Sequence, residues 1–189
     1  MNTESKKIKF AVLGVGRIGK RHAEMILRHS EAKLVALCDI KASEHLGLER
    51  YTCPFFSSFE DLLASNLSID VLCVCTPNGL HAQQSIRALE AGMHIVCEKP
   101  MGLDKKSCEA VIFSSLKANK HVFCVMQNRY SPPARWIKQL VDEALLGSIH
   151  MVQINCYWNR DDRYYFKEGI KHSWKGSEVL DGGPLFTQF

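Results

Sequence analysis

Short apolar runs alternate along the chain with segments in which apolar residues return every three or four positions. The first pattern predicts strands and the second predicts helices. Strands are expected at residues 8–13, 34–39, 71–75, 94–97 and 121–126. Helices are expected at residues 17–28, 59–64, 81–91 and 105–118. This alternation is typical of a parallel sheet with helices on both faces, so residues 1–126 are predicted to form a doubly wound α/β domain.

From residue 127 onward the pattern differs. A helix is predicted to begin at Pro132 or Pro133 and to end at Gly147, because proline suits the first helical turn and glycine suits the end. Residues 149–158 have partial alternation, as in a strand of an antiparallel sheet with one face on the core. Residues 159–181 are polar, charged and aromatic without a period, which predicts a loop. We therefore expect residues 127–189 to begin a second domain of the α+β class with a mainly antiparallel sheet.

Three glycines follow the first strand at the spacing G-x-G-x-x-G. Gly14 suits a tight turn, Gly16 lets the backbone approach a diphosphate, and Gly19 lets the following helix pack closely on the strand. Alone, these glycines would suit any tight strand-to-helix turn. Asp39 ends the second strand, where a carboxylate can accept both hydroxyls of a ribose. Together they predict a dinucleotide-binding turn, with the phosphates at a helix N-terminus.

Composition narrows the class of protein. The net charge of +4 is carried by scattered lysines, which disfavours nucleic acid as a partner. The eight cysteines lie mostly in apolar runs, so we expect no disulfides. Cys73 and Cys75 are spaced C-x-C in a predicted strand, which places both thiols on one side, and no second Cys or His pair has metal spacing, so no metal site is expected. The first nine residues are polar and no 18-residue apolar run occurs, so neither a signal peptide nor a membrane span is expected. The cytoplasm is the expected location.

Polar, turn-forming residues follow two later strands, at residues 76–81 and 98–100. Because the carboxyl ends of parallel strands form the ligand-binding edge of an open α/β sheet, these residues are candidates for a cofactor cleft. Each has an ordinary alternative explanation. Residues 76–77 could merely end a strand, His81 could be a first-turn helix residue, and Lys99 could be a solvated loop lysine. Their joint position beside the glycine turn favours the cleft.

These motifs, in this order and spacing, resemble the Gfo/Idh/MocA family of NAD(P)-dependent oxidoreductases, which includes glucose–fructose oxidoreductase and inositol dehydrogenase. The similarity rests on the glycine fingerprint, T-P-N-x-x-H, A-G-x-H-I-x-C-E-K-P and N-R-Y, and E-K-P is the most diagnostic element. The ending W-K-G and D-G-G-P-L-F-T-Q-F resembles members associated with nucleotide sugars. The resemblance implies a Rossmann domain, then a substrate and dimerisation domain, and a homo-oligomer when the protein is full length.

The resemblance also implies the residues of the site. The cofactor would be bound by Gly14, Gly16, Arg17, Ile18, Gly19, Asp39, Thr76, Pro77, Asn78, His81, Glu98 and Gln127. Lys99 would be catalytic, because an ammonium there can stabilise developing alkoxide character on the substrate and relay the hydroxyl proton. The substrate would contact Lys99, Arg129, Tyr165 and Trp174. A salt bridge between domains explains Arg129 nearly as well, and packing explains the aromatic residues equally well.

The sequence thus predicts an oxidoreductase that transfers a hydride between NAD(P) and a hydroxyl of a sugar, nucleotide sugar or cyclic polyol. NAD is expected to bind more tightly than NADP, since the carboxylate of Asp39 would repel a 2′-phosphate, although Lys41 would partly offset this. Two alternatives stay open: a non-catalytic NAD-binding module or sensor, and a lyase or isomerase that uses bound NAD transiently.

The resemblance further implies a general-base histidine in an Asp-x-x-x-His pattern. Thr187 stands at the position of that aspartate, and the histidine would fall beyond Phe189. We therefore expect a C-terminally truncated piece that binds NAD without turnover.

Overall fold

The computed structural model describes residues 7–157, 159–167, 170–171 and 174–183. By their contacts these residues form two compact units. One unit contains residues 7–125 together with 176–183, and the other contains the described residues between 126 and 175. The boundary between folding domains that the sequence places after residue 126 stays a prediction.

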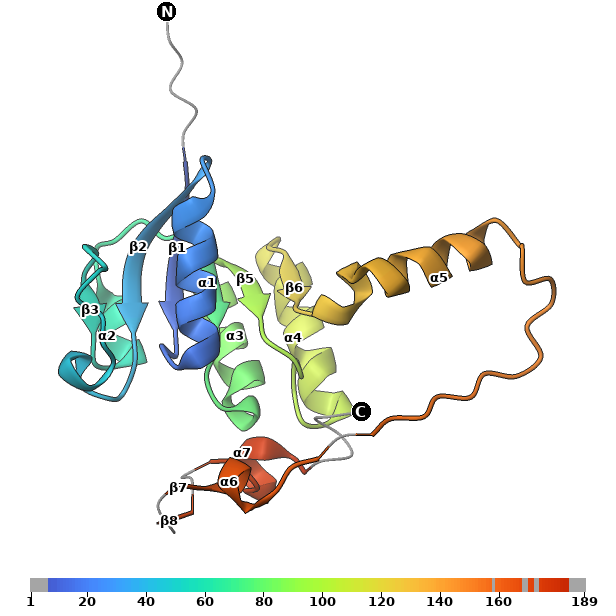
Figure 1. Ribbon diagram of the computed structural model, residues 1–189. Helices are drawn as coiled ribbons and strands as arrows, with labels where there is room; N and C mark the ends of the chain where they lie inside the picture. The colour runs from blue at the N-terminus through green and yellow to red at the C-terminus, as the bar shows by residue number, and fades with distance from the viewer. Residues whose placement is uncertain (1–6, 158, 168–169, 172–173, 184–189) are drawn as a thin grey trace, which may run out of the picture. The chain divides into compact units, whose positions relative to one another are not determined.

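A six-stranded parallel sheet forms the centre of the first unit, in the order β3-β2-β1-β4-β5-β6 (Figure 1). Its strands are β1 (Ile8–Leu13), β2 (Ala32–Cys38), β3 (Phe55–Phe56), β4 (Val71–Val74), β5 (His94–Cys97) and β6 (Val122–Cys124). The order reverses between β1 and β4, and open α/β sheets bind their ligands at such a switch point. The predicted doubly wound Rossmann sheet is confirmed. Only β3 was missed, because two residues are too few to produce a period.

The helices of this unit are α1 (Arg17–Arg28), α2 (Phe59–Ala64), α3 (His81–Glu90), α4 (Lys105–Ala118) and α7 (Glu178–Asp181), with the 3-10 turns η1 (Ser43–His45) and η2 (Asn78–Leu80). Local capping explains where two of them begin. The hydroxyl of Ser58 accepts the N–H of Asp61 at the start of α2, and Asp104 forms a capping box with Ser107 at the start of α4.

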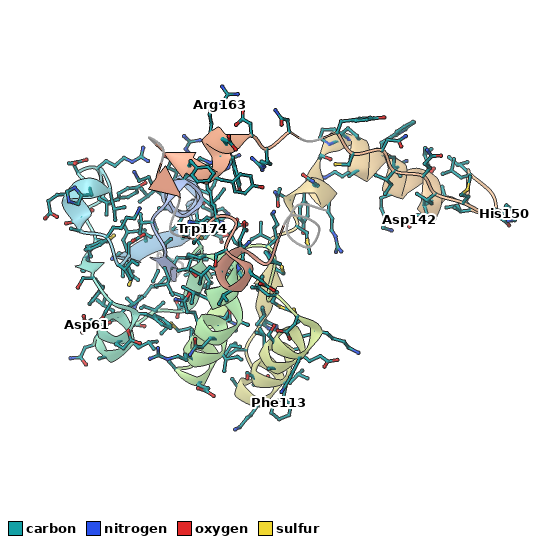
Figure 2. The ribbon with its side chains drawn as sticks, turned by 90° about the horizontal axis from the view of Figure 1, so that it is seen from below. Asp61, Phe113, Asp142, His150, Arg163 and Trp174 are labelled. Atoms are coloured by element: carbon teal, nitrogen blue, oxygen red, sulfur yellow. The ribbon has the colours of Figure 1, made fainter. Side chains whose placement is uncertain are left out.

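Alternate residues of the central strands pack into two apolar clusters, one on each face of the sheet. Ala11 and Leu13 of β1 belong to the cluster that includes residues of α3 and α4. Val12, between them, belongs to the cluster that includes residues of α1. This arrangement follows from the two-residue period of a strand and explains why consecutive residues such as 10–13 of β1 are all apolar. Figure 2 shows Phe113 on the outer side of α4, where its side chain is exposed.

Three cysteines of the sheet are buried within these clusters: Cys38, Cys73 and Cys97. Cys73 belongs to the cluster on the α1 face and Cys75 packs against the same cluster, so the two thiols face one side, as the C-x-C spacing predicts. Burial raises the pKa of the Cys38 and Cys73 thiols to about 12. Since the thiolate is the nucleophile and metal ligand, these cysteines act as apolar packing groups.

Among the described residues no cluster of three or more His, Cys, Asp and Glu side chains could hold a metal ion. The described part of the chain also contains no helix with the length and hydropathy needed to span a membrane.

The second unit contains the 3-10 turn η3 (Gln127–Tyr130), helices α5 (Pro132–Asp142) and α6 (Asp162–Tyr165), and the antiparallel strands β7 (Phe166–Lys167) and β8 (Ile170–Lys171). Helix α5 begins at Pro132, one of the two predicted positions. Its predicted end at Gly147 is wrong. Leu145 N–H donates to the carbonyl of Leu140 and Ala144 N–H donates to that of Val141, a Schellman pair with Ala144 at a φ of +54°.

Two further expectations for this region are corrected. The predicted strand at residues 149–158 is absent from residues 149–157, and residue 158 lies outside the described ranges. No described strand pairs with residues 149–157, and a strand needs such a partner to satisfy its backbone. The predicted loop at 159–181 contains α6, β7, β8 and α7, which are too short to leave a period in the sequence. A mainly antiparallel second domain stays a prediction.

Candidate functional site

The glycine turn between β1 and α1 is built from three glycines with different roles. An ideal Cβ on Gly14, whose φ is +86°, would lie 2.7 Å from the carbonyl carbon of Cys75. An ideal Cβ on Gly19 would lie 1.9 Å from the carbonyl oxygen of Gly14, so α1 packs directly on the turn. A Cβ on Gly16 would meet no atom within 4 Å. The first and third glycines are therefore required for packing. Gly16 faces an open space, in which a ligand can approach the protein backbone closely.

The N-terminus of α1 is suited to an anion. Gly16 is its N-cap residue, so no side chain caps the first turn, and that turn contains no acidic residue. The first N–H groups and the positive end of the helix dipole therefore face the open space at Gly16. A cavity of about 710 Å³ opens beside the turn, and Arg17, Lys20 and Arg21 are among its lining residues. These features fit a dinucleotide diphosphate.

Asp39 lies beside this turn, half-buried at the end of β2. Its Oδ2 accepts the N–H of Val15 at 2.7 Å, and its Oδ1 accepts the N–H of Lys41 at 2.9 Å. Each carboxylate oxygen can accept a second hydrogen bond, so the group keeps capacity for the hydroxyls of a ribose. The structure thus brings Asp39 and the glycine turn together, and the ribose contact stays a prediction.

The residues after β4 form a turn that is joined to the residues after β5. His81 is only 1% exposed, and its ring nitrogens lie 2.7 Å from the carbonyl oxygens of Thr76 and Pro100. The hydroxyl of Thr76 donates to Oε1 of Gln84 at 2.5 Å. His81 therefore links the segment after β4 to the segment after β5. In this structure both of its ring nitrogens are occupied by backbone carbonyl groups, and its contact with a cofactor stays a prediction.

Asn78 contacts a segment that is distant in the sequence. Its side-chain amide donates to the carbonyl oxygen and to Oδ1 of Asp181, both at 3.0 Å, while Oδ2 of Asp181 accepts the N–H of Gly176. Asp181 is 5% exposed. The sequence singles out Asp181 only as the first residue of D-G-G-P and does not predict its contact with Asn78, because the two residues are 103 positions apart.

Glu98 and Lys99 follow β5 at the same edge of the sheet. Oε1 of Glu98 lies 2.8 Å from Nε2 of His22, and its Oε2 accepts the backbone N–H of Lys99 at 3.3 Å. Lys99 is half-buried. Sequence reasoning missed His22, which in the sequence is an ordinary polar position of α1. Four strand ends thus contribute Gly14, Asp39, Thr76 and Glu98 to one edge, as predicted for parallel strands.

The remaining candidates belong to the second unit. Gln127 and Arg129 are exposed in η3. Tyr165 packs edge-to-face on Tyr164 with ring centroids 5.0 Å apart. Trp174, marked in Figure 2, is half-buried. Their roles in binding cofactor or substrate stay predictions.

The ring of Tyr164 lies 4.0 Å from the guanidinium carbon of Arg160 and 4.1 Å from Nζ of Lys175. These cations within about 6 Å of the ring centroid stabilise the aromatic pair by cation–π attraction.

Comparison with known proteins agrees with this fold. Residues 8–125 match the sequence model of the oxidoreductase family with the NAD-binding Rossmann fold. Inositol 2-dehydrogenase of Rhizobium meliloti (strain 1021) is 30% identical over 148 residues, which are 78% of this chain and 44% of that protein. The 2,7-anhydro-N-acetylneuraminate hydratase of Escherichia coli (strain K12) is 27% identical over 179 residues, which are 95% of this chain and 46% of that protein.

A solved structure extends the comparison. The WlbA dehydrogenase of Bordetella pertussis, in complex with NADH and UDP-GlcNAcA, is 33% identical and superposes with a TM-score of 0.89, covering 97% of this chain and 54% of that one. The chain therefore spans about half the length of the relatives that it matches.

Proposed function

Since this chain belongs to the oxidoreductase family with the NAD-binding Rossmann fold, we propose that it carries the cofactor half of a dehydrogenase acting on a hydroxyl of a sugar, nucleotide sugar or cyclic polyol. The observation that carries the proposal is the uncapped N-terminus of α1 at Gly16, which shares one sheet edge with Asp39, Glu98 and Lys99. An inositol dehydrogenase and a WlbA dehydrogenase bound to NADH and a UDP-sugar, both among the similar proteins, support this class of substrate.

Different residues of the chain bind different parts of the dinucleotide. The first N–H groups of α1, at Arg17 and Ile18, hold the diphosphate, and Asp39 accepts the hydroxyls of the adenosine ribose. Bound NAD supplies the hydride acceptor. The carboxylate of Asp39 would repel a 2′-phosphate on this ribose, so NAD is preferred to NADP.

Lys99 acts on the substrate. Its ammonium donates a hydrogen bond to the oxygen on the reacting carbon and stabilises the alkoxide character that develops there. As the hydride leaves for NAD, Lys99 takes up the hydroxyl proton and releases one of its own protons to water. Its backbone N–H is held by Glu98, which follows β5 directly, so the residue starts from a defined position.

One comparison favours a second candidate function. A relative that matches 95% of this chain is named a hydratase. In a reaction of that kind, NAD is reduced and reoxidised within one turnover, and its net redox state does not change.

Turnover of the full-length protein with NAD and a panel of inositols and UDP-sugars tests the proposal. A steady rise in nicotinamide absorbance with an oxidised product supports the dehydrogenase. Product formation at constant absorbance supports the second candidate. NAD binding without turnover of any compound supports a binding module instead.

Two further expectations, on oligomeric state and on location in the cell, belong with this proposal. We expect the full-length protein to be a homo-oligomer, which light scattering measures directly. We also place its reaction in the cytoplasm, where fractionation would find the protein.

A further inference from the structure

The side chain of His22 reaches across the sheet edge to Glu98. His22 Nε2 lies 2.8 Å from Oε1 of Glu98, and the two side chains are 18% and 16% exposed. The two residues are 76 positions apart in the sequence. At this exposure the contact lies largely out of water, so its geometry is better defined than that of a surface ion pair.

The position of this pair in the sheet gives it a function. His22 lies in the second turn of α1, whose first turn is the open cradle at Gly16. Glu98 follows β5, and its backbone N–H donates to the carbonyl of Val74 at 3.0 Å, which extends the ladder between β4 and β5. The hydrogen bond between His22 and Glu98 therefore joins α1, which follows β1, to the end of β5, which lies in the other half of the sheet.

The two halves of the sheet carry equivalent carboxylates. In the first half, Asp39 follows β2, the strand next to β1; in the second half, Glu98 follows β5, the strand next to β4. A Rossmann sheet binds one mononucleotide on each half. If Asp39 faces the first ribose, the same place in the second half of the sheet would bring Glu98 to the second ribose.

Both carboxylates are held in the same way. Each oxygen of Asp39 accepts one backbone N–H. In Glu98, Oε2 accepts the N–H of Lys99 and Oε1 bonds to His22. One hydrogen bond on each oxygen fixes the plane of the carboxylate and leaves further capacity on each oxygen for a hydroxyl. Glutamate has one more rotatable bond than aspartate, so it needs a partner such as His22 to fix its terminal group.

We propose that His22 is a positioning residue for the second ribose of the dinucleotide, acting by orienting the Glu98 carboxylate to accept the hydroxyls of that ribose. This inference rests on the proposed function, because it presumes a dinucleotide. It assigns to α1 a role in both halves of the site: the first turn holds the diphosphate, and the second turn orients the ribose acceptor.

Calorimetry on the full-length protein with three ligands tests the inference. ADP contains the adenosine and both phosphates, ADP-ribose adds the second ribose, and NADH adds the nicotinamide. We expect His22→Ala to weaken ADP-ribose and NADH alike, by about 10-fold, and to change ADP by less than about 2-fold. Glu98→Gln should show the same selectivity. The double variant should be no weaker than Glu98→Gln alone, because both changes remove one interaction.

Two further variants complete the test. His22→Gln retains an N–H donor and should bind NADH within about 3-fold of the wild type. Met25→Ala, at an exposed position of the same helix, controls for changes in α1 itself and should bind all three ligands normally. Equal weakening of ADP, ADP-ribose and NADH by His22→Ala would overturn the inference, as would no weakening of any of them. A wild-type protein that binds none of the three ligands would instead overturn the proposed function.

Discussion

The backbones of Gly79 and Val179 meet directly: an ideal Cβ on Gly79 would lie 2.1 Å from the carbonyl oxygen of Val179. Real Cβ atoms do not approach backbone oxygens so closely, so only glycine allows η2 and α7 to pack in this way. The hydrogen bonds from Asn78 to Asp181 support the same contact, one residue from Gly79 and two residues from Val179. The segment 176–183 is thereby attached to the turn that follows β4.

Substitution of Gly79 by alanine should detach this segment. Because the obstacle is backbone rather than a flexible side chain, we expect Gly79→Ala to reduce the free energy of unfolding by about 1–3 kcal/mol. Hydrogen exchange of the amides of residues 176–182 should rise at the same time. Denaturant unfolding and exchange mass spectrometry measure both effects, and unchanged exchange in this segment would contradict the packing.

Substitution of Gly16 by alanine should instead affect NAD binding more than stability. A Cβ there meets no protein atom, so the free energy of unfolding should change by no more than about 1 kcal/mol, the scale of an N-cap effect. The methyl group would occupy the proposed diphosphate cradle, and we expect NAD affinity to fall by at least about 10-fold. Calorimetry measures the affinity. Normal NAD binding by Gly16→Ala would exclude the cradle as the diphosphate site.

Asp39 should determine the choice between NAD and NADP. Asp39→Asn removes the negative charge but retains an oxygen that can accept the N–H of Val15. We expect the wild type to bind NAD more tightly than NADP and the variant to narrow that difference. The test is to measure the dissociation constants of NAD and NADP for the wild type and for Asp39→Asn. A wild type that prefers NADP would refute the role given to Asp39.

Lys99 should affect turnover and not cofactor binding. We expect Lys99→Met in the full-length protein to lower kcat by about 100-fold or more, because the proton relay is lost, while the dissociation constant for NAD stays nearly unchanged. Steady-state kinetics and calorimetry separate the two quantities. Substantial residual turnover would refute the catalytic role, and a large loss of NAD affinity would make Lys99 a cofactor ligand.

His94 should make stability depend on pH. Its burial, followed by the charges of Lys120 and His121, lowers its pKa below the usual value of 6.5, and Asp70 opposes the shift. His94 Nδ1 also accepts the backbone N–H of His121 at 3.0 Å. Because the folded state favours neutral His94, its contribution to stability is present above about pH 6.5 and is lost as the pH falls through the lower, folded-state value.

The matched variant for this effect is His94→Asn, which keeps an acceptor for the N–H of His121 but does not titrate. We expect the wild type to lose thermal stability relative to His94→Asn as the pH falls below 6.5. Melting temperatures of both proteins across this range measure the difference. A constant difference between the two proteins would show that His94 does not contribute to the pH dependence.

Much of the cofactor unit follows from local sequence. The bounds of α2, α4 and β5 agree with the predicted ranges, and for the two helices the caps Ser58 and Asp104 act within a few residues of the helix start. The roles of Gly14 and Gly19 were predictable for the same reason: a tight turn and a close helix contact both restrict the residue type at one position.

Predictions for the second unit were weaker where they depended on partners. An alternating pattern at residues 149–157 is insufficient for a strand when no described neighbour pairs with it. The end of α5 at Asp142 was missed because Ala144, whose positive φ follows the helix end, is a residue type that favours helix. Only the pair of backbone hydrogen bonds to Leu140 and Val141 shows that the helix has ended.

By itself the sequence determined the Rossmann sheet, the glycine turn and the strand-end positions of Asp39, Glu98 and Lys99, because a strand period and a turn are properties of neighbouring residues. Only the tertiary structure decided that His22 bonds to Glu98 and that Asn78 bonds to Asp181, contacts that span 76 and 103 positions. Such partners are determined by the packing of whole helices and strands against each other. The residues next to a polar side chain in the sequence do not indicate which distant group it will contact.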